Sequence, residues 1–126
     1  MFNLFATAAD VLENNKSKYF IDFQKNNRPS GLGYIERHCV DYFFEAIHED
    51  VKAANEVSVI IVKSINATVI DVSQEGTHKV GTIRYNAVLS VDGEVETIDE
   101  FWHFVYDGWN WKLAGIEQPL DENEGE

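Results

Sequence analysis

The hydrophobic pattern of this chain changes its period near Val57. Before that residue, apolar side chains recur at the spacing of amphipathic helices. After it, apolar and polar residues alternate and β-branched residues are frequent, which is typical of strands. A chain with helices first and strands second is expected to form an α+β fold, in which the helices cover one face of a sheet.

The N-terminal half contains two helical patterns. The first covers residues 2–23 and continues past the weak helix formers Asn14 and Asn15, so it predicts one helix, either straight or bent at that point. In the loop "NNRPSG", Pro29 fixes the turn and Ser30 is a candidate N-cap. The second pattern predicts a single helix that ends before Asn55. Its apolar stripe consists of Leu32, Ile35, Cys39, Tyr42, Phe43, Ala46, Ile47 and Val51.

The C-terminal half predicts a meander of antiparallel strands. The stretch "VSVIIVKSINATVIDVSQ" is either one bent strand or two strands joined near Ser64, and "EGTH" is a turn. Asp92 and Gly93 are a strong signal for a type I′ hairpin turn, and Asp107 and Gly108 repeat it. We therefore predict N-terminal helices packed on a curved antiparallel sheet of about four strands, in a single domain of residues 1–118.

The stretch "DEFWHFVYDGWNWKLAGIEQ", residues 99–118, holds much of the aromatic content. Alternation places Phe101 and His103 on one face of its first strand and Trp102 and Phe104 on the other. Both faces are largely apolar, so we expect this strand in the middle of the sheet, with both faces covered and most aromatic side chains in the core. Alternation also predicts the two faces of the last strand. One face carries Trp109, Trp111 and Leu113, and the opposite face carries Lys112, Ala114 and Ile116.

The charge balance excludes two classes of partner. With 10 basic and 22 acidic residues the net charge is −12, and without the C-terminal "DENEGE" it is still −8. Nucleic-acid binding requires a basic surface that neutralises phosphates, so we expect no nucleic acid partner. The same repulsion argues against direct binding to anionic membranes. Residues 119–126 are predicted to form an acidic disordered tail.

Cysteine content and the N-terminus suggest a cytoplasmic protein. Cys39 is the only cysteine, so an internal disulfide or a thiolate zinc cluster is excluded, and it is most simply a buried apolar residue. The start "MFNLFATAADVLENN" lacks the basic region of a signal peptide. No run approaches the ~20 apolar residues of a membrane-spanning helix. We expect neither a metal nor a cofactor.

The C-terminal half also resembles a known family. The segments "ATVIDVSQEG" and "VGTIRYNAVLSVDGEVETIDEFWHFVYDGWNWKLAGIEQ" resemble the C-terminal domain of the mitochondrial inner-membrane import-motor tether, translocase subunit forty-four, and of its bacterial relatives. The most telling residues are an acidic residue before an aromatic pair that ends in Trp102, then Trp111 and "LAGIEQ". This Tim-forty-four-like family is similar to the nuclear transport factor two-like superfamily.

The resemblance implies a fold and a kind of site. It implies a curved antiparallel sheet wrapped around helices, which enclose a conical and often apolar cavity, and a non-enzymatic scaffold function. We therefore expect a binding module whose partner is a protein or an apolar small molecule, and the exposed sheet face offers a surface for a homodimer. The candidate pocket residues are Tyr42, Tyr85, Phe101, Trp102, His103 and Trp111.

The alternative is a small acid–base enzyme, of isomerase or dehydratase type, that acts on a hydrophobic small molecule in the cone. Asp99, Glu100 and His103 supply the acidic and basic groups that such chemistry needs. However, Asp99 and His103 are about 13 Å apart along an extended strand and cannot touch. Asp99 is instead expected to pair with Arg84 or Lys112.

A helical row of His38, Asp41, Glu45 and His48 has ligand spacing for a metal. The row lies opposite the apolar stripe, so we interpret it as a solvated polar face.

Overall fold

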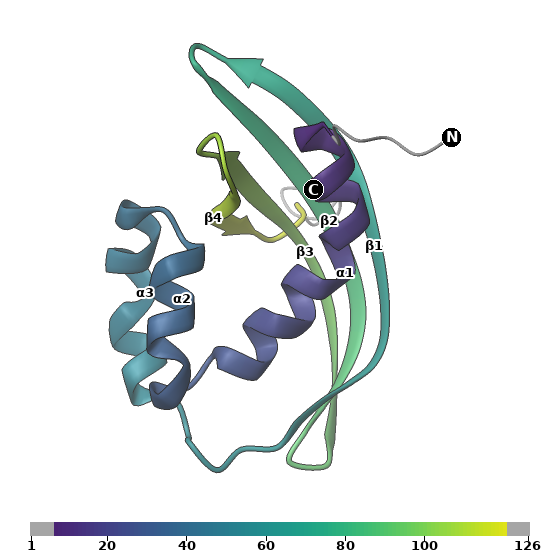
Figure 1. Cartoon of the computed structure of the whole chain (residues 1–126). Helices are drawn as coiled ribbons and strands as arrows, with labels where there is room; N and C mark the ends of the chain where they lie inside the picture. Colours follow the sequence, from purple (N-terminus) through teal and green to yellow (C-terminus); the bar gives the residue numbers. More distant parts are fainter. Residues whose placement is uncertain (1–6, 121–126) are drawn as a thin grey trace.

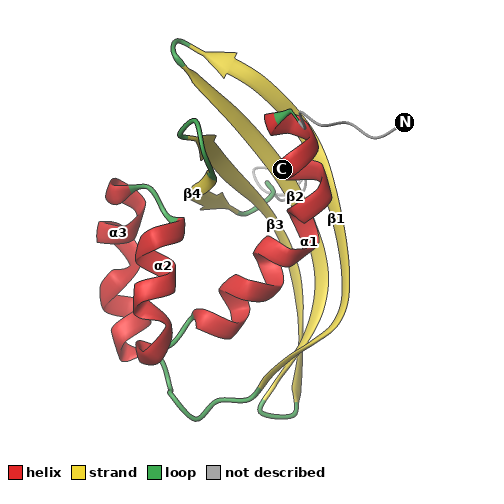
Figure 2. Cartoon of the chain, in the orientation of Figure 1, coloured by secondary structure: helices red, strands yellow, loops and turns green. Residues whose placement is uncertain are grey.

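The computed structural model describes residues 7–120, which form an α+β fold with helices on one side of a curved four-stranded antiparallel sheet (Figures 1 and 2). This confirms the predicted fold class. The helical elements are α1 (Ala8–Asn26), the 3₁₀ helix η1 (Pro29–Gly31), α2 (Leu32–His38) and α3 (Asp41–Ala53). The strands are β1 (Ile60–Glu75), β2 (His78–Val91), β3 (Glu94–Tyr106) and β4 (Trp111–Glu117), in the order β1-β2-β3-β4.

The first helix begins with a reciprocal cap. The Thr7 hydroxyl accepts from the Asp10 backbone N–H, and the Asp10 carboxylate accepts from the Thr7 N–H. The helix continues through Asn14 and Asn15, as the pattern of residues 2–23 predicted, but Phe2 and Phe5 lie outside the described residues. Figure 1 shows α1 crossing the concave face of the sheet.

The second predicted helix is interrupted, which corrects the single helix expected over residues 32–51. Cys39 and Val40 adopt extended conformations between α2 and α3. The Val40 N–H donates to the Leu113 carbonyl at 3.0 Å, and Cys39 forms a parallel bridge with Leu113 of β4. A contact with the sheet edge therefore overrides a continuous helical pattern.

The loop before α2 also differs from expectation, because Ser30 caps no helix. Ser30 lies in η1, and its hydroxyl and backbone N–H both donate to the Glu56 carboxylate. Arg28 donates to the carbonyls of Glu56 and Ser58. These contacts fasten the connection from α3 to β1 against the end of α1.

The strands follow the predicted meander. β1 is one strand, and register shifts between Val62 and Ser64 and between Val69 and Asp71 bend it. The β2–β3 turn has φ angles of 51° at Asp92 and 88° at Gly93, as a type I′ turn requires. No helix among residues 7–120 combines the length and apolar character needed to cross a bilayer.

The core lies between the helices and the concave face of the sheet. Phe20 packs on Tyr85 and Trp102 with ring centroids 5.0 and 5.3 Å apart, and Phe23 meets Trp102 edge-on at 5.5 Å. In "KVGTIRYNAVLSV", which lies in β2, apolar residues at every second position predict one inner face, and the structure buries all four of them. These are Ile83, Tyr85, Ala87 and Leu89.

β3 is an inner strand, as expected, but in the described part of the chain no element covers its second face. Phe101, His103 and Val105 lie half-buried on this convex face. Their neighbours on adjacent strands shield them instead. The Arg84 guanidinium, for example, lies over the Phe101 ring at 5.2 Å.

The grouping of residues on the last strand is also corrected. Trp109 lies in the β3–β4 loop and is 86% exposed, whereas Trp111 and Leu113 are buried. A register shift next to Gly115 places Ile116 opposite Trp102, so Ile116 joins the concave face rather than the outer one. Period-2 alternation fails here because a bulge adds one residue.

Candidate functional site

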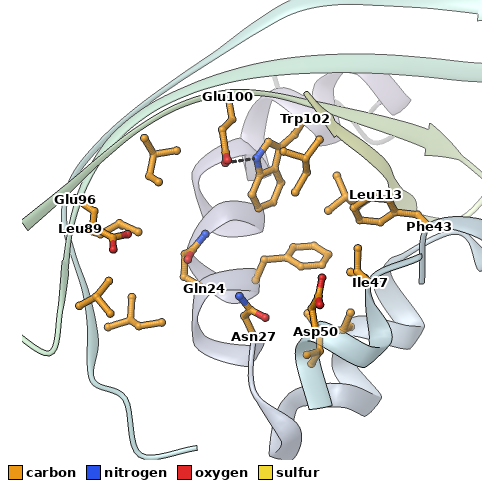
Figure 3. Close-up of a pocket in the computed structure, with 17 residues that line it drawn as sticks. Gln24, Asn27, Phe43, Ile47, Asp50, Leu89, Glu96, Glu100, Trp102 and Leu113 are labelled. Atoms are coloured by element: carbon orange, nitrogen blue, oxygen red, sulfur yellow. Dashed lines mark hydrogen bonds between the residues drawn. The ribbon is translucent and has the colours of Figure 1, made fainter. Parts of the chain in front are cut away.

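A half-enclosed hollow of about 430 Å³ lies between the concave face of the sheet and the helices, and we call it the sheet–helix hollow (Figure 3). Its volume is within the range of about 300–1,000 Å³ typical of small-molecule sites. The helical wall is apolar and consists of Phe23, Ile35, Phe43, Ile47 and Val51. The sheet wall consists of Ile60, Leu89, Val91, Ile98, Trp102, Leu113 and Ile116.

Five polar side chains complete the lining. Gln24 and Asn27 come from the C-terminal end of α1 and its cap, Asp50 from α3, and Glu96 and Glu100 from β3. Figure 3 shows them around an otherwise apolar surface. Glu100 already has partners, because it accepts from Trp102 Nε1 at 3.1 Å and from Gln118 Nε2 at 2.9 Å.

Of the six pocket residues predicted from the sequence, only Trp102 lines the hollow. Tyr85 and Trp111 are on the concave side but belong to the packed core. The Tyr85 hydroxyl donates to the Lys16 carbonyl at 2.6 Å, and Trp111 Nε1 donates to the Ala8 carbonyl at 2.7 Å. Both side chains therefore fasten α1 to the sheet.

The other three candidates lie outside the hollow. Tyr42 is 67% exposed on α3, because the break before that helix moves it away from the core. Phe101 and His103 lie on the convex face of β3. These three side chains therefore do not line the sheet–helix hollow, whereas Trp102, which lies between Phe101 and His103 in the sequence, does.

The acid–base candidates are engaged in pairs on the convex face. Arg84 donates from Nε and Nη2 to the two oxygens of Asp99 at 2.9 and 2.7 Å. Arg84 is one of the two partners that the sequence predicted for Asp99. These hydrogen bonds hold the pKa of Asp99 below its usual range. His103 Nε2 donates to Glu117 Oε1 at 2.7 Å, and the Thr82 hydroxyl lies 2.9 Å from Nδ1.

The helical row with metal-ligand spacing is split by the break at Cys39 and Val40. His38 lies in α2, where its ring stacks on Tyr34 at 3.9 Å and its Nδ1 contacts the Tyr34 carbonyl. His48 lies in α3, where its Nδ1 contacts the Glu45 carbonyl. Among residues 7–120, no cluster of histidine, cysteine or acidic side chains could hold a metal ion.

Most residues that line the hollow were not identified from the sequence. The apolar stripe contained Ile35, Phe43 and Ile47, but nothing indicated that they border a cavity rather than fill a core. Asp50 and Glu96 resemble ordinary surface acids in the sequence. Their positions at the border of one hollow depend on sheet curvature and on the position of α3, which only the tertiary structure specifies.

Comparison with protein-family models, with curated proteins and with solved structures finds no match to this chain.

Proposed function

We propose that this protein is a non-enzymatic binding module that takes an apolar ligand, a small molecule or an apolar part of a protein partner, in the sheet–helix hollow. The observation that carries the proposal is the hollow itself, in which twelve of the seventeen lining residues are apolar. Such a surface loses contact with water when a ligand binds, and each buried Å² of apolar area contributes roughly 25 cal/mol.

The resemblance to the Tim-forty-four-like domain supports the same function and stays a proposal. Its support is the spaced pattern that ends in "LAGIEQ", the order of helices before strands, and a hollow on the concave side of a curved sheet. A fold alone does not determine function, so we carry over the binding role and no specific partner.

The acid–base enzyme is the less favoured alternative. Its candidate groups Asp99 and His103 face away from the hollow, and each is held by a neighbouring strand. Glu100 does line the hollow, but both of its oxygens accept hydrogen bonds from the protein. A general acid or base must reach a substrate proton, and neither Asp99 nor His103 can do so from the convex face.

A homodimer through the sheet is a further proposal. The convex face carries half-buried apolar side chains such as Phe101 and Val105 next to the ion pair of Arg84 and Asp99. Light scattering after size-exclusion chromatography would give the mass in solution. A dimer that Phe101→Glu converts to a monomer would support this surface, and a wild-type monomer would contradict it.

The binding function is tested by titration with the neutral apolar fluorophore N-phenyl-1-naphthylamine. We expect saturable binding with a blue-shifted emission. Ile116→Trp places a bulky ring in the hollow and should weaken binding at least tenfold. Val95→Trp, a change of similar size on the exposed convex face, is the control and should leave binding unchanged. No saturable binding, or equal losses in both variants, would refute the proposal.

A further inference from the structure

The charge around the sheet–helix hollow has one sign. Its polar lining consists of three acidic residues and two amides, and none of the lining residues in the described chain is basic. The acids come from separate elements, Asp50 from α3 and Glu96 and Glu100 from β3, yet they border the same apolar surface (Figure 3). A ligand in the hollow is therefore exposed to a negative potential.

Two of these acids have no partner within residues 7–120. Some other carboxylates among residues 7–120 are paired, as Asp99 is with Arg84 and Asp107 with Lys112. Asp50 and Glu96, by contrast, form neither an ion pair nor a hydrogen bond among the described residues. Their oxygens are available to a donor that the protein does not supply.

We propose that the sheet–helix hollow selects small apolar molecules that carry a protonated amine, in preference to neutral or anionic molecules of the same shape. This inference rests on the proposed binding function and specifies its ligand class. The apolar part of the ligand packs on the walls near Trp102 and Ile98. The ammonium group has three donors and no acceptor, so it suits an unpaired carboxylate at the border of the hollow, either Asp50 on α3 or Glu96 on β3.

Charge also disfavours the opposite ligand class. A fatty acid or another apolar anion would place its carboxylate near three carboxylates, with no lysine, arginine or histidine in the lining to compensate. Repulsion of this kind contributes to specificity as much as attraction does. The net charge of −12 adds a longer-range repulsion of anionic ligands.

The test uses three probes with one phenyl ring and one four-carbon chain: 4-phenylbutylamine, 4-phenylbutanol and 4-phenylbutanoate. Isothermal titration calorimetry at low ionic strength gives their affinities for the full chain. We expect the amine to bind about tenfold tighter than the alcohol, because three acidic residues and no basic residue line the hollow. The carboxylate should bind most weakly. In about 1 M salt, where the Debye length is about 3 Å, the preference should largely vanish.

The double variant Asp50→Asn, Glu96→Gln assigns the preference to the hollow. Both residues are exposed, so the fold should tolerate the exchange. The amine should lose most of its advantage while the alcohol binds as before. The control Asp71→Asn, Glu75→Gln changes the net charge equally at two exposed positions of β1 and should keep the preference.

Each result decides between explanations. If the three probes and N-phenyl-1-naphthylamine all fail to bind, the proposed function fails together with this inference. If the alcohol binds as tightly as the amine, the pocket stands and the charge preference is wrong. If both double variants reduce the preference equally, net charge causes it and the assignment to Asp50 and Glu96 is wrong.

Two other occupants would also overturn the inference. A wild-type dimer that Ile116→Trp converts to a monomer would show that a second copy fills the hollow. A basic apolar peptide that displaces N-phenyl-1-naphthylamine where the amine does not would identify a protein segment instead.

Discussion

Replacing Gly81 with alanine tests how closely α1 approaches the sheet. A Cβ atom at this position of β2 would lie 2.5 Å from Leu12 Cδ2 and 3.3 Å from Trp111 Cζ3. Neither neighbour can move into solvent, because Leu12 is fully buried and Trp111 is 3% exposed. The Trp111 indole is also held by its hydrogen bond to the Ala8 carbonyl. The glycine therefore allows helix and sheet to pack in direct contact.

Two opposing contributions determine how much Gly81→Ala changes the free energy of unfolding. Overpacking a core costs about 1–3 kcal/mol. Replacing a glycine in a strand returns about 0.5–1 kcal/mol of conformational entropy. Gly81→Ala should therefore lower the free energy of unfolding by about 1–2 kcal/mol. Leu12→Ala alone should cost about 2–5 kcal/mol, because it removes buried methyl groups and leaves a cavity.

The combination of the two substitutions isolates the contact. With Leu12→Ala in place, the closest atom is gone and the new methyl enters the vacated space. Gly81→Ala should then be neutral or stabilising by up to about 1 kcal/mol, so that the double-mutant cycle gives a coupling energy of about 1–3 kcal/mol. The Gly115→Ala variant is the control, because a Cβ there has no atom within 4 Å. There the entropy term acts without overpacking, so Gly115→Ala should raise stability by up to about 1 kcal/mol rather than lower it.

Urea unfolding followed by tryptophan fluorescence measures these differences. With a slope of about 1–3 kcal/mol/M, a loss of 2 kcal/mol shifts the midpoint by roughly 1 M. The slopes should stay equal, since the variants change stability rather than the surface exposed. If Gly81→Ala costs the same in both backgrounds to within about 0.5 kcal/mol, the contact between Leu12 and β2 is not as close as described.

Three further predictions concern the core and the convex face. Tyr85→Phe removes the hydrogen bond to Lys16 without leaving a cavity, so it should cost about 0.5–1.5 kcal/mol in urea unfolding, and no change would contradict a buried bond. Burial raises the pKa of Cys39 to about 12 and leaves it 1% exposed, so a thiol reagent at pH 8 should label the native protein far more slowly than the unfolded chain. Arg84→Met should raise the pKa of Asp99 in an NMR titration, since hydrogen bonds from Arg84 lower it. A lowered pKa in the folded state means that the pair stabilises above the usual range of aspartate and that this stabilisation is lost as pH falls through the lowered value, so the wild type should lose more stability in acid than the variant.

The sheet could be predicted because its signals are local. Alternation along β2 identified the inner side chains directly, since a strand turns every second residue to the same face. Asp92 and Gly93 identified the hairpin, because a type I′ turn needs two residues that tolerate positive φ. The same reasoning failed at Ile116, where a bulge shifts the register, and a bulge has no reliable local signal.

The candidate site could be predicted much less well. Trp102 borders the hollow because it shares the concave face of β3 with the core. Phe101 and His103 were misassigned because an apolar face of a strand does not by itself say whether helices or solvent cover it. Asp50 and Glu96 were missed because charged residues on a helix and near a turn are normally solvated. Their positions beside the hollow depend on elements that are far apart in sequence.

The break at Cys39 and Val40 explains why there is a hollow at all. A straight helix over residues 32–51 would extend about 30 Å, and it would leave the edge of β4 without a partner. The chain instead exchanges helical hydrogen bonds for one between Val40 and the Leu113 carbonyl. It then turns, so that α2 and α3 lie side by side as Figure 1 shows, with Ile35 of α2 and Phe43 of α3 both facing the hollow. The sheet edge thus determines the direction of α3, and α3 in turn supplies Phe43, Ile47 and Val51 to the helical wall of the sheet–helix hollow.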